Sequence, residues 1–379
     1  MSLNNYLEAK PLYYDEIDYT RMPRVYESIK PYLVIPKIIH IIGTNGKGTT
    51  GRFLASALYS SGVKVGHYTS PHILDFNERI WLNGKDIDSV TLELAHEKLQ
   101  TYLDKDDSDS LSYFEYTTLL AVLVYKDCDY IVMEAGLGGE HDATAVFPKI
   151  LTLVTPISLD HEAFLGSTIK EIATTKLNAI QNNAIVAKQS SNDVYEVIEK
   201  LDKNIYKLDD FLNNDDLLNI NSIADELQLA PYLKDNLTLS ISAFKFLKIK
   251  YKNTDFKSAR LFGRLTNIND KIIVDVGHNV LAAKSIVSAL SGDKYIIIYN
   301  SYKDKNYKEI LEILKPIALH VEIIDVDETR IEELKVMKMT LDSLNIKNSK
   351  FKEINKDEKY LVFGSFSVVE SFLNKMMEI

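Results

Sequence analysis

A glycine-rich loop between an apolar strand and a helix constrains this chain more than any other stretch. Four isoleucines within residues 38–42 precede the sequence GTNGKGTT, which covers residues 43–50. Apolar residues from Phe53 onward recur at the spacing of one helix face. Backbone N–H groups at the start of such a helix, with a lysine such as Lys47 beside them, bind phosphate. The loop therefore predicts a nucleotide-phosphate site.

The spacing within this loop departs from the common phosphate-binding pattern. The loop is shorter than in G-x-x-x-x-G-K-[ST], and Gly48 separates Lys47 from Thr49. An ordinary glycine-rich turn between a strand and a helix is the alternative interpretation. The order of strand, glycines, lysine and two hydroxyls favours phosphate binding over that alternative.

The rest of the chain alternates apolar strands with amphipathic helices, which predicts two α/β domains. A length of 379 residues exceeds what one hydrophobic core usually organises. We expect a P-loop ATPase-like domain with a parallel sheet over residues 1–255 and a smaller, Rossmann-like α/β domain over residues 256–379. Residues 181–235 are hard to assign, and the acidic segment 104–110 is expected to be a solvated loop.

The composition excludes several classes of protein. A net charge of −10 argues against a broad nucleic-acid-binding surface. The single cysteine, Cys128, excludes an intrachain disulfide framework and a cysteine-ligated zinc site, and it fits a reducing compartment. The N-terminal residues are polar and acidic, unlike a signal peptide, and no apolar run is long enough to span a bilayer. We therefore expect a cytoplasmic protein without a membrane partner.

Polar residues follow several predicted strands directly. Ser70 follows the second strand, Glu134 ends the apolar run at 130–133, and His161 comes after the run at 150–154. Ligands of open parallel sheets bind beyond the carboxyl ends of the strands. A carboxylate placed like Glu134, beside a phosphate loop, is expected to hold the magnesium of a nucleotide. The alternatives are a surface carboxylate for Glu134 and a structural role for His161.

Of four further polar residues, three have two interpretations each. Lys176, on a helix that starts near residue 167, is expected on residue type to be a solvated lysine. Asp275 and His278 follow the first strand of the second domain and could meet a nucleotide, or could only stabilise a loop. Arg264 could bind a phosphate as a bidentate fork or form an ordinary salt bridge.

Taken together, these segments resemble the folylpolyglutamate synthase/dihydrofolate synthase family of the Mur ligase superfamily. The resemblance covers most of the chain in family order and leaves out mainly residues 181–235 and 326–359. The similar stretches are GTNGKGTT (Gly43–Thr50), YTSPHILDFNERI (Tyr68–Ile80), LSYFEYTTLLA (Leu111–Ala121), MEAGLGGEHDAT (Met133–Thr144), VTPISLDHEAFLG (Val154–Gly166), GR (Gly263-Arg264), DVGHN (Asp275–Asn279), DK (Asp304-Lys305) and GSF (Gly364–Phe366).

The resemblance implies an ATP site, a pair of magnesium ions and a pterin-binding surface. One magnesium ion would be held by Ser70 and Glu134, with help from Thr49. A second would be held by Glu134, His161 and Lys176, with Lys176 carbamylated by CO2. Phe114 would lie beside the pterin-bearing substrate, on which an aromatic ring can stack. The residues implied to bind ATP are Thr44, Asn45, Gly46, Lys47, Gly48, Thr49, Thr50, Asn236, Arg264, Asp275 and His278.

The reaction implied by the resemblance is ATP-dependent amide formation. L-Glutamate would be added to dihydropteroate, to folate mono- or polyglutamates, or to both, through an acyl phosphate. Lys47, Glu134, His161 and Lys176 would be the catalytic residues, and the protein would be a monomer acting on small molecules. The alternatives are another Mur-type amide ligase and a P-loop protein that only binds or hydrolyses nucleotide.

Some positions depart from the pattern of the family. Thr175 stands where the family usually has a glutamate before the modified lysine, and Leu177-Asn178 replace the usual small residues after it. Glu140 occupies a position where arginine is common, and Ala145 one where asparagine is usual.

Overall fold

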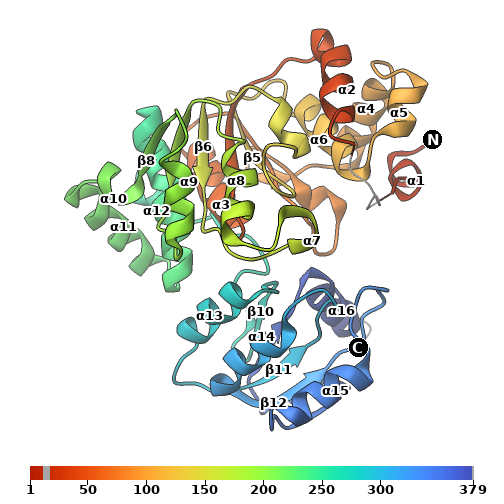
Figure 1. Cartoon of the computed structure of the whole chain (residues 1–379), viewed down its shortest axis with the longest axis vertical. Coiled ribbons are helices and arrows are strands. Elements are labelled where there is room, and N and C mark those ends of the chain that lie inside the picture. The colour runs from red at the N-terminus through yellow and green to blue at the C-terminus, as the bar shows by residue number, and fades with distance from the viewer. Residues whose placement is uncertain (12–17, 378–379) are drawn as a thin grey trace. The chain divides into compact units, whose positions relative to one another are not determined.

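The computed structural model describes residues 1–11 and 18–377, and these divide into two compact units. The first unit comprises the described residues of Met1–Ser70, Phe76–Leu229 and Leu233–Arg260. The second comprises those of Pro71–Asp75, Ala230–Tyr232 and Leu261–Ile379. Each unit contains one mostly parallel sheet with helices around it, so the predicted α/β fold class is confirmed (Figure 1).

The first unit is built on an eight-stranded sheet in the order β4-β3-β2-β5-β1-β6-β7-β8. All neighbours from β2 to β8 pair in parallel, whereas β3 pairs antiparallel with both β2 and β4. The strands are β1 (Lys37–Ile42), β2 (Val65–Tyr68), β3 (Ile80–Leu82), β4 (Lys85–Asp86), β5 (Tyr130–Glu134), β6 (Leu151–Val154), β7 (Asn183–Val186) and β8 (Asn204–Lys207).

Helices and short 3-10 turns connect these strands. They are α1 (Leu3–Glu8), α2 (Arg21–Ile29), η1 (Lys30–Tyr32), α3 (Lys47–Ser60), η2 (Phe76–Arg79), α4 (Ser89–Gln100), α5 (Lys105–Ser110), α6 (Tyr113–Val124), η3 (Ala143–Val146), α7 (Glu162–Leu165), α8 (Ile169–Leu177), α9 (Asn192–Ile198), α10 (Leu208–Phe211), α11 (Asn214–Glu226), α12 (Pro231–Leu247) and η4 (Asn253–Phe256).

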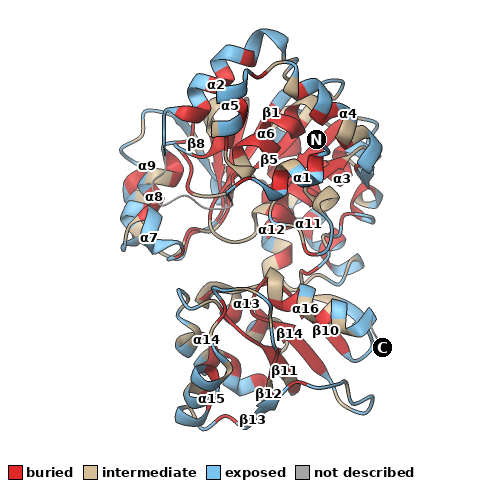
Figure 2. Cartoon of the chain, turned by 90° about the vertical axis from the view of Figure 1, so that its right-hand side faces the viewer, coloured by how far each residue is buried: buried red, intermediate tan, exposed pale blue. Residues whose placement is uncertain are grey.

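Both faces of this sheet are covered. One face packs against α2, α4 and α6 over β1, β2 and β5, and against α8 and α9 toward β7. The other face packs against α3, α11 and α12. The central strands are therefore buried along nearly their whole length, as the red colour of β1 and β5 in Figure 2 shows. The carboxyl ends of β2, β5, β1 and β6 lie next to one another in that order.

The second unit has a six-stranded sheet in the order β13-β12-β11-β14-β10-β9, in which only β9 and β10 pair antiparallel. Its strands are β9 (Thr266–Asn269), β10 (Ile272–Asp275), β11 (Tyr295–Tyr299), β12 (Ala318–Ile323), β13 (Asn348–Lys350) and β14 (Tyr360–Phe363). Its helices are α13 (Val280–Ala289), α14 (Tyr307–Leu314), η5 (Lys315–Ile317), α15 (Leu334–Ser343) and α16 (Phe366–Met377).

The core of the second unit includes a residue from far earlier in the chain. Helices α13, α14 and α15 pack on one face of the sheet and α16 on the other. Ile73 is buried in the cluster on the α16 face, among side chains of β10 and β14. The short segment Pro71–Asp75 therefore belongs to this unit, although its sequence neighbours on both sides lie in the first.

The acidic segment 104–110 was predicted wrongly as a solvated loop. Asp104 caps helix α5 by accepting a hydrogen bond from the Asp107 amide, and Asp107 and Ser108 are buried. An N-cap aspartate at the start of an acidic first turn stabilises a helix whatever its hydrophobicity. Residues 181–235, which were hard to assign from the sequence, form β7, α9, β8, α10 and α11. These elements are mostly short, and the helices α9 and α11 start with polar caps.

No described helix is long and apolar enough to cross a membrane.

Candidate active site

The glycine loop lies at the carboxyl end of β1, as predicted. Gly46 ends the loop with a left-handed backbone (φ 88°) and serves as the N-cap of α3. A Cβ atom at this position would overlap the Asn236 side-chain amide, so the structure brings Asn236 against the loop. The amides of Thr44 and Asn45 donate to the Pro156 carbonyl, at 2.9 and 3.4 Å. A phosphate bound by those two amides would compete with that carbonyl.

The Lys47 side chain contacts both the loop and the end of the neighbouring strand β5. Its ammonium group donates to the Thr44 carbonyl at 3.2 Å and lies 3.8 Å from Glu134 Oε1. It is also the first residue of α3, whose N-terminus attracts anions through its backbone N–H groups. The positive charge, the helix start and the carboxylate therefore meet at one point.

Glu134 is the last residue of β5 and is buried rather than on the surface. It pairs with Ile41 across the sheet, which places it beside the loop that follows β1. Its Oε2 accepts a short hydrogen bond from the Thr69 hydroxyl and a 3.3 Å bond from the Ser70 amide. Ser70 was predicted from the sequence, whereas Thr69 was not. The available signal for Thr69 was its hydroxyl directly after β2, the neighbour of β5.

The oxygen groups here suit magnesium. The Thr49 hydroxyl is buried and has no hydrogen-bond partner, and Glu134 Oε1 faces the Lys47 ammonium group. Among the described residues, no three His, Cys, Asp or Glu side chains gather into a metal site. A magnesium ion at Glu134 would therefore complete its shell with hydroxyls, nucleotide phosphates and water, as Mg²⁺ does in proteins.

Lys176 is buried, so the prediction of a solvated lysine was wrong. It lies on α8, and its ammonium group donates to the Gly43 carbonyl of the loop at 3.0 Å. Burial, and then the charge of Lys47, lower the pKa of the Lys176 amino group to about 7. Residue type alone could not reveal this, because the burial follows from the packing of α8 beneath the loop.

His161 lies at the same edge of the sheet but is more exposed. It follows β6, adopts a left-handed backbone (φ 52°) and precedes α7. Its side chain is 44% exposed, and its Nε2 lies 4.0 Å from Asp160 Oδ1.

Phe114, on the first turn of α6, packs against the chain that follows β5. Its ring stacks on Tyr68, with 5.8 Å between centroids. A Cβ atom at Gly136 would lie only 2.5 Å from Phe114 Cζ. The Phe114 ring can therefore occupy this position only because residue 136 has no side chain. Tyr68 precedes Ser70 by two residues, and Gly136 follows Glu134 by two. The aromatic surface therefore borders the proposed metal site.

The predicted residues of the second unit gather at the end of β10. Asp275 is buried and accepts hydrogen bonds from Tyr232 OH, the Leu265 amide and the Gly277 amide. Burial raises the pKa of the Asp275 carboxyl group, and Arg264 opposes that shift. The Arg264 guanidinium lies 5.0 Å from the centre of the Phe366 ring. His278 Nδ1 lies 3.2 Å from the Val276 carbonyl.

Comparison with known proteins identifies the family. No family model matches the chain. A curated dihydrofolate synthase/folylpolyglutamate synthase of Buchnera aphidicola (subspecies Baizongia pistaciae) is 30% identical over 86% of this chain and 83% of its own. The chain belongs to the dihydrofolate synthase/folylpolyglutamate synthase family. The folylpolyglutamate synthetase of Helicobacter pylori, a solved structure, is 36% identical with a TM-score of 0.79, covering 100% of this chain and 98% of that one.

A third similar protein was solved with ligands. It is the bifunctional folylpolyglutamate synthase/dihydrofolate synthase of Yersinia pestis, with Mn, AMPPNP and L-glutamate bound. Its TM-score is 0.82 at 22% identity, and the match covers 99% of this chain and 97% of that one. At this identity the similarity supports the fold.

Three departures from the family pattern lie in contact, with Glu140 hydrogen-bonded to both of the others. The Glu140 carboxylate accepts a 2.8 Å hydrogen bond from the Asn178 side-chain amide, and the Glu140 amide donates to the Thr175 carbonyl. Glu140 and Asn178 therefore join the glycine loop after β5 to the end of α8, the helix that carries Lys176.

Proposed function

We propose that this protein is an ATP-dependent ligase that adds L-glutamate to dihydropteroate, to reduced folate mono- or polyglutamates, or to both. The observation that carries the proposal is the 3.8 Å approach of Lys47 to the buried Glu134, at the start of α3. A cation, a helix N-terminus and a carboxylate arranged in this way suit a magnesium–nucleotide complex. Family membership makes ATP-driven glutamate addition the reaction that such a site would serve.

ATP would bind with its phosphates at the N-terminus of α3. Lys47 would hold the β- and γ-phosphates as a point charge, and Asn236 lies against the same loop. A γ-phosphate near Lys47 would be oriented for attack by a carboxylate. The contacts of Arg264, Asp275 and His278 with the nucleotide stay predictions that come from the resemblance.

Magnesium would be held by Glu134 with the hydroxyls of Ser70 and Thr49, and at a second position by Glu134, His161 and Lys176. When bound, it neutralises charge on the phosphates. A buried, neutral Lys176 amine is the form that can attack CO2, giving a carbamate and releasing a proton. A lysine with a carbamate would present oxygens of the kind that Mg²⁺ prefers. The hydrogen bond from the Lys176 amine to the Gly43 carbonyl supports a position of this side chain beside the loop.

The chemistry would proceed in two steps on the substrates. The carboxylate of the pterin-bearing acid attacks the γ-phosphorus, giving an acyl phosphate and ADP. The amine of L-glutamate then attacks the acyl carbon, the C–O bond to phosphate breaks, and an amide and inorganic phosphate result. The protein aligns the anions and stabilises their charge through Lys47. Phe114 would supply a stacking surface for the pterin ring.

A set of parallel ADP-release assays tests this proposal. The acceptors are 7,8-dihydropteroate and a reduced folate monoglutamate, each with and without L-glutamate. We expect ADP release that requires both an acceptor and glutamate, and we expect Lys47→Ala to abolish it without lowering thermal stability. ADP release that is independent of acceptor would support a plain nucleotide hydrolase instead. No activity with either acceptor would remove the folate assignment.

We also propose that the protein acts as a cytoplasmic monomer on small molecules, without nucleic-acid or membrane partners. The net charge of −10 supports the exclusion of nucleic acid. Light scattering coupled to gel filtration would test the monomer.

A further inference from the structure

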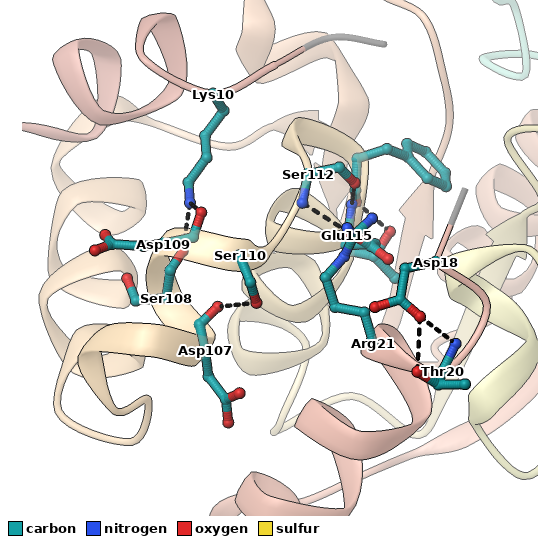
Figure 3. Close-up of polar contacts among 12 residues, drawn as sticks. Lys10, Asp18, Thr20, Arg21, Asp107, Ser108, Asp109, Ser110, Ser112 and Glu115 are labelled. Atoms are coloured by element: carbon teal, nitrogen blue, oxygen red, sulfur yellow. Dashed lines mark hydrogen bonds and ion pairs between the residues drawn. The ribbon is translucent and has the colours of Figure 1, made fainter. Parts of the chain in front are cut away.

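The N-terminal residues contact helix α6, which carries Phe114, and the preceding helix α5. Three cations of this region each contact a group on α5 or α6, as Figure 3 shows in part. Lys10 donates to the Ser108 and Asp109 carbonyls. Arg24 pairs with Asp107, and Arg21 pairs with Glu115. The mechanism proposed above uses none of these three cations.

The Arg21–Glu115 pair differs from the Arg24–Asp107 pair in burial. Arg21 Nε lies 2.8 Å from Glu115 Oε2, and the two side chains are only 9% and 11% exposed. The Arg24 side chain, in contrast, is 57% exposed. The partner of Arg24, Asp107, has a side chain that is only 6% exposed, so this pair is buried on one side. The Arg21–Glu115 pair is buried on both sides, and removing one partner of such a pair leaves an uncompensated charge.

Glu115 also fixes the start of α6. It completes a capping box, in which the Ser112 hydroxyl accepts from the Glu115 amide and Glu115 Oε2 accepts from the Ser112 amide at 2.8 Å. The same oxygen receives the Arg21 hydrogen bond. Figure 3 shows Arg21, Glu115 and Ser112 converging at this point. One carboxylate oxygen thus joins α2 to the first turn of α6.

That first turn carries two aromatic residues, Phe114 and Tyr113. Phe114 lies between Tyr68 and Gly136, as described above. Tyr113 lies under the Arg79 guanidinium, 5.1 Å from the ring centre. The Tyr113 amide donates to the Pro11 carbonyl at 3.4 Å, so the N-terminal segment also contacts this turn through its backbone. A shift of the turn would move both rings.

We propose that Arg21 is a positioning residue for the acid substrate. Through Glu115 it holds the first turn of α6, and so the face that Phe114 presents to the flat ring system of the acceptor. Arg21 itself contacts neither the substrate nor the nucleotide phosphates. This inference rests on the proposed function, because it assumes that a pterin-bearing acid binds at Phe114.

The experiment compares steady-state kinetics of Arg21→Ala and Arg24→Ala in the full-length protein. For Arg21→Ala we expect the KM for 7,8-dihydropteroate or reduced folate to rise about tenfold, with the KM for ATP and kcat changed less than about twofold, because the loss is in acceptor binding alone. Arg24→Ala is the matched control, since its side chain is exposed and its partner lies on α5, and we expect its KM values to stay near wild type. Arg21→Lys, which keeps the charge, should recover part of the loss.

Other outcomes would overturn the positioning role. An unchanged acceptor KM in Arg21→Ala would do so, as would equal losses in kcat and in the KM values for ATP and acceptor. If Arg21→Ala does not fold, Glu115→Gln replaces it. That variant keeps an oxygen acceptor for the Ser112 amide but weakens the Arg21 contact, and the same rise in acceptor KM alone is expected.

Different experimental results would contradict the role of Arg21 and the proposed function. A wild-type protein without glutamate-dependent ADP release would remove the proposed function and, with it, this inference. An active wild-type protein with an unaffected Arg21→Ala variant would remove only the role of Arg21. Calorimetric titration of dihydropteroate into both proteins without ATP gives an independent measure of acceptor binding.

Discussion

Single hydrogen bonds decide how the central carboxylate of the site is held. Glu134 shares one oxygen between the Thr69 hydroxyl and the Ser70 amide, while its other oxygen faces Lys47. A carboxylate oriented by such partners presents its remaining lone pairs in a fixed direction. Groups that orient a metal ligand contribute to metal affinity although they do not touch the metal.

Thr69→Val should therefore weaken the use of magnesium. The substitution keeps the shape of the side chain and removes the donor to Glu134 Oε2. We expect the magnesium concentration for half-maximal activity to rise about tenfold, the lower end of such effects. Thr69→Ser, which keeps the hydroxyl, is the control. A Thr69→Val variant with the magnesium dependence of wild type would contradict the role of this contact.

Lys149 gives a prediction about pH and stability. It is buried, its ammonium group donates to the Ala145 carbonyl at 2.8 Å, and burial lowers its pKa from 10.5 to about 8. Between pH 8 and 10.5 the unfolded chain holds a proton on Lys149 that the folded protein has lost. The free energy of unfolding therefore gains a contribution that rises with pH in this window, by at most about 1.4 kcal/mol per pH unit.

Lys149→Met removes this titration and keeps the length of the side chain. Urea unfolding of both proteins between pH 7.5 and 9.5 should show the free energy of wild type rising relative to that of the variant. A difference that stays flat across the window would mean that the Lys149 pKa is close to its ordinary value.

At the scale of elements, the site depends on how closely α3 approaches β2. Gly51 in α3 has no side chain, and a Cβ atom there would overlap Nε2 of the buried His67 on β2. The ring is held by the packing around it and by the Arg52 guanidinium, whose Nε lies 3.4 Å from His67 Nδ1. Helix α3 can therefore pack at this distance only with glycine at position 51.

Gly51→Ala should destabilise the protein despite its higher helix propensity. Alanine gains up to about 1 kcal/mol in a helix interior, and overpacking a core costs about 1–3 kcal/mol. We expect a net loss of about 1–2 kcal/mol in guanidinium unfolding from these two opposing effects. Added to His67→Ala, the same change should cost less, because the contact is already gone. Equal costs in both backgrounds would place the strain elsewhere.

At the scale of the whole molecule, the second unit includes Ile73 from the segment Pro71–Asp75. Its side chain contacts the cluster that includes Val276, and the residue is 4% exposed, whereas the adjacent Leu74 is 46% exposed. Ile73→Ala should lower the stability of the second unit by about 2–4 kcal/mol, the usual cost of such a buried truncation. Hydrogen exchange of the β10 and β14 amides would measure it.

Leu74→Ala is the matched control for this prediction, and little change in exchange is expected for it. Faster exchange in β10 and β14 for Leu74→Ala but not for Ile73→Ala would reverse the assignment of the buried residue.

The sequence predicted the parts of this protein that depend on local pattern. Apolar runs predict the central strands, and Ser70, Glu134 and His161 lie near the carboxyl ends of these strands, while their roles stay predictions. Burial by distant segments cannot be predicted from a local pattern, which is why the sequence predicts a solvated lysine at position 176 and a loop over residues 104–110. Thr69 was missed because a threonine after a strand is unremarkable until its neighbour across the sheet is known. The antiparallel β9 was missed because its residues are mostly polar and exposed.

The membership of Pro71–Asp75 and Ala230–Tyr232 in the second unit has a consequence for inheritance. A gene break after the codon for Arg260 would encode a second unit that lacks Ile73 from its core and Tyr232, the hydroxyl partner of Asp275. Recombination that exchanged only residues 261–379 between relatives would combine most of the second unit from one protein with the segments Pro71–Asp75 and Ala230–Tyr232 from another. We expect these short segments to have evolved in step with the second unit rather than with their neighbours in the chain.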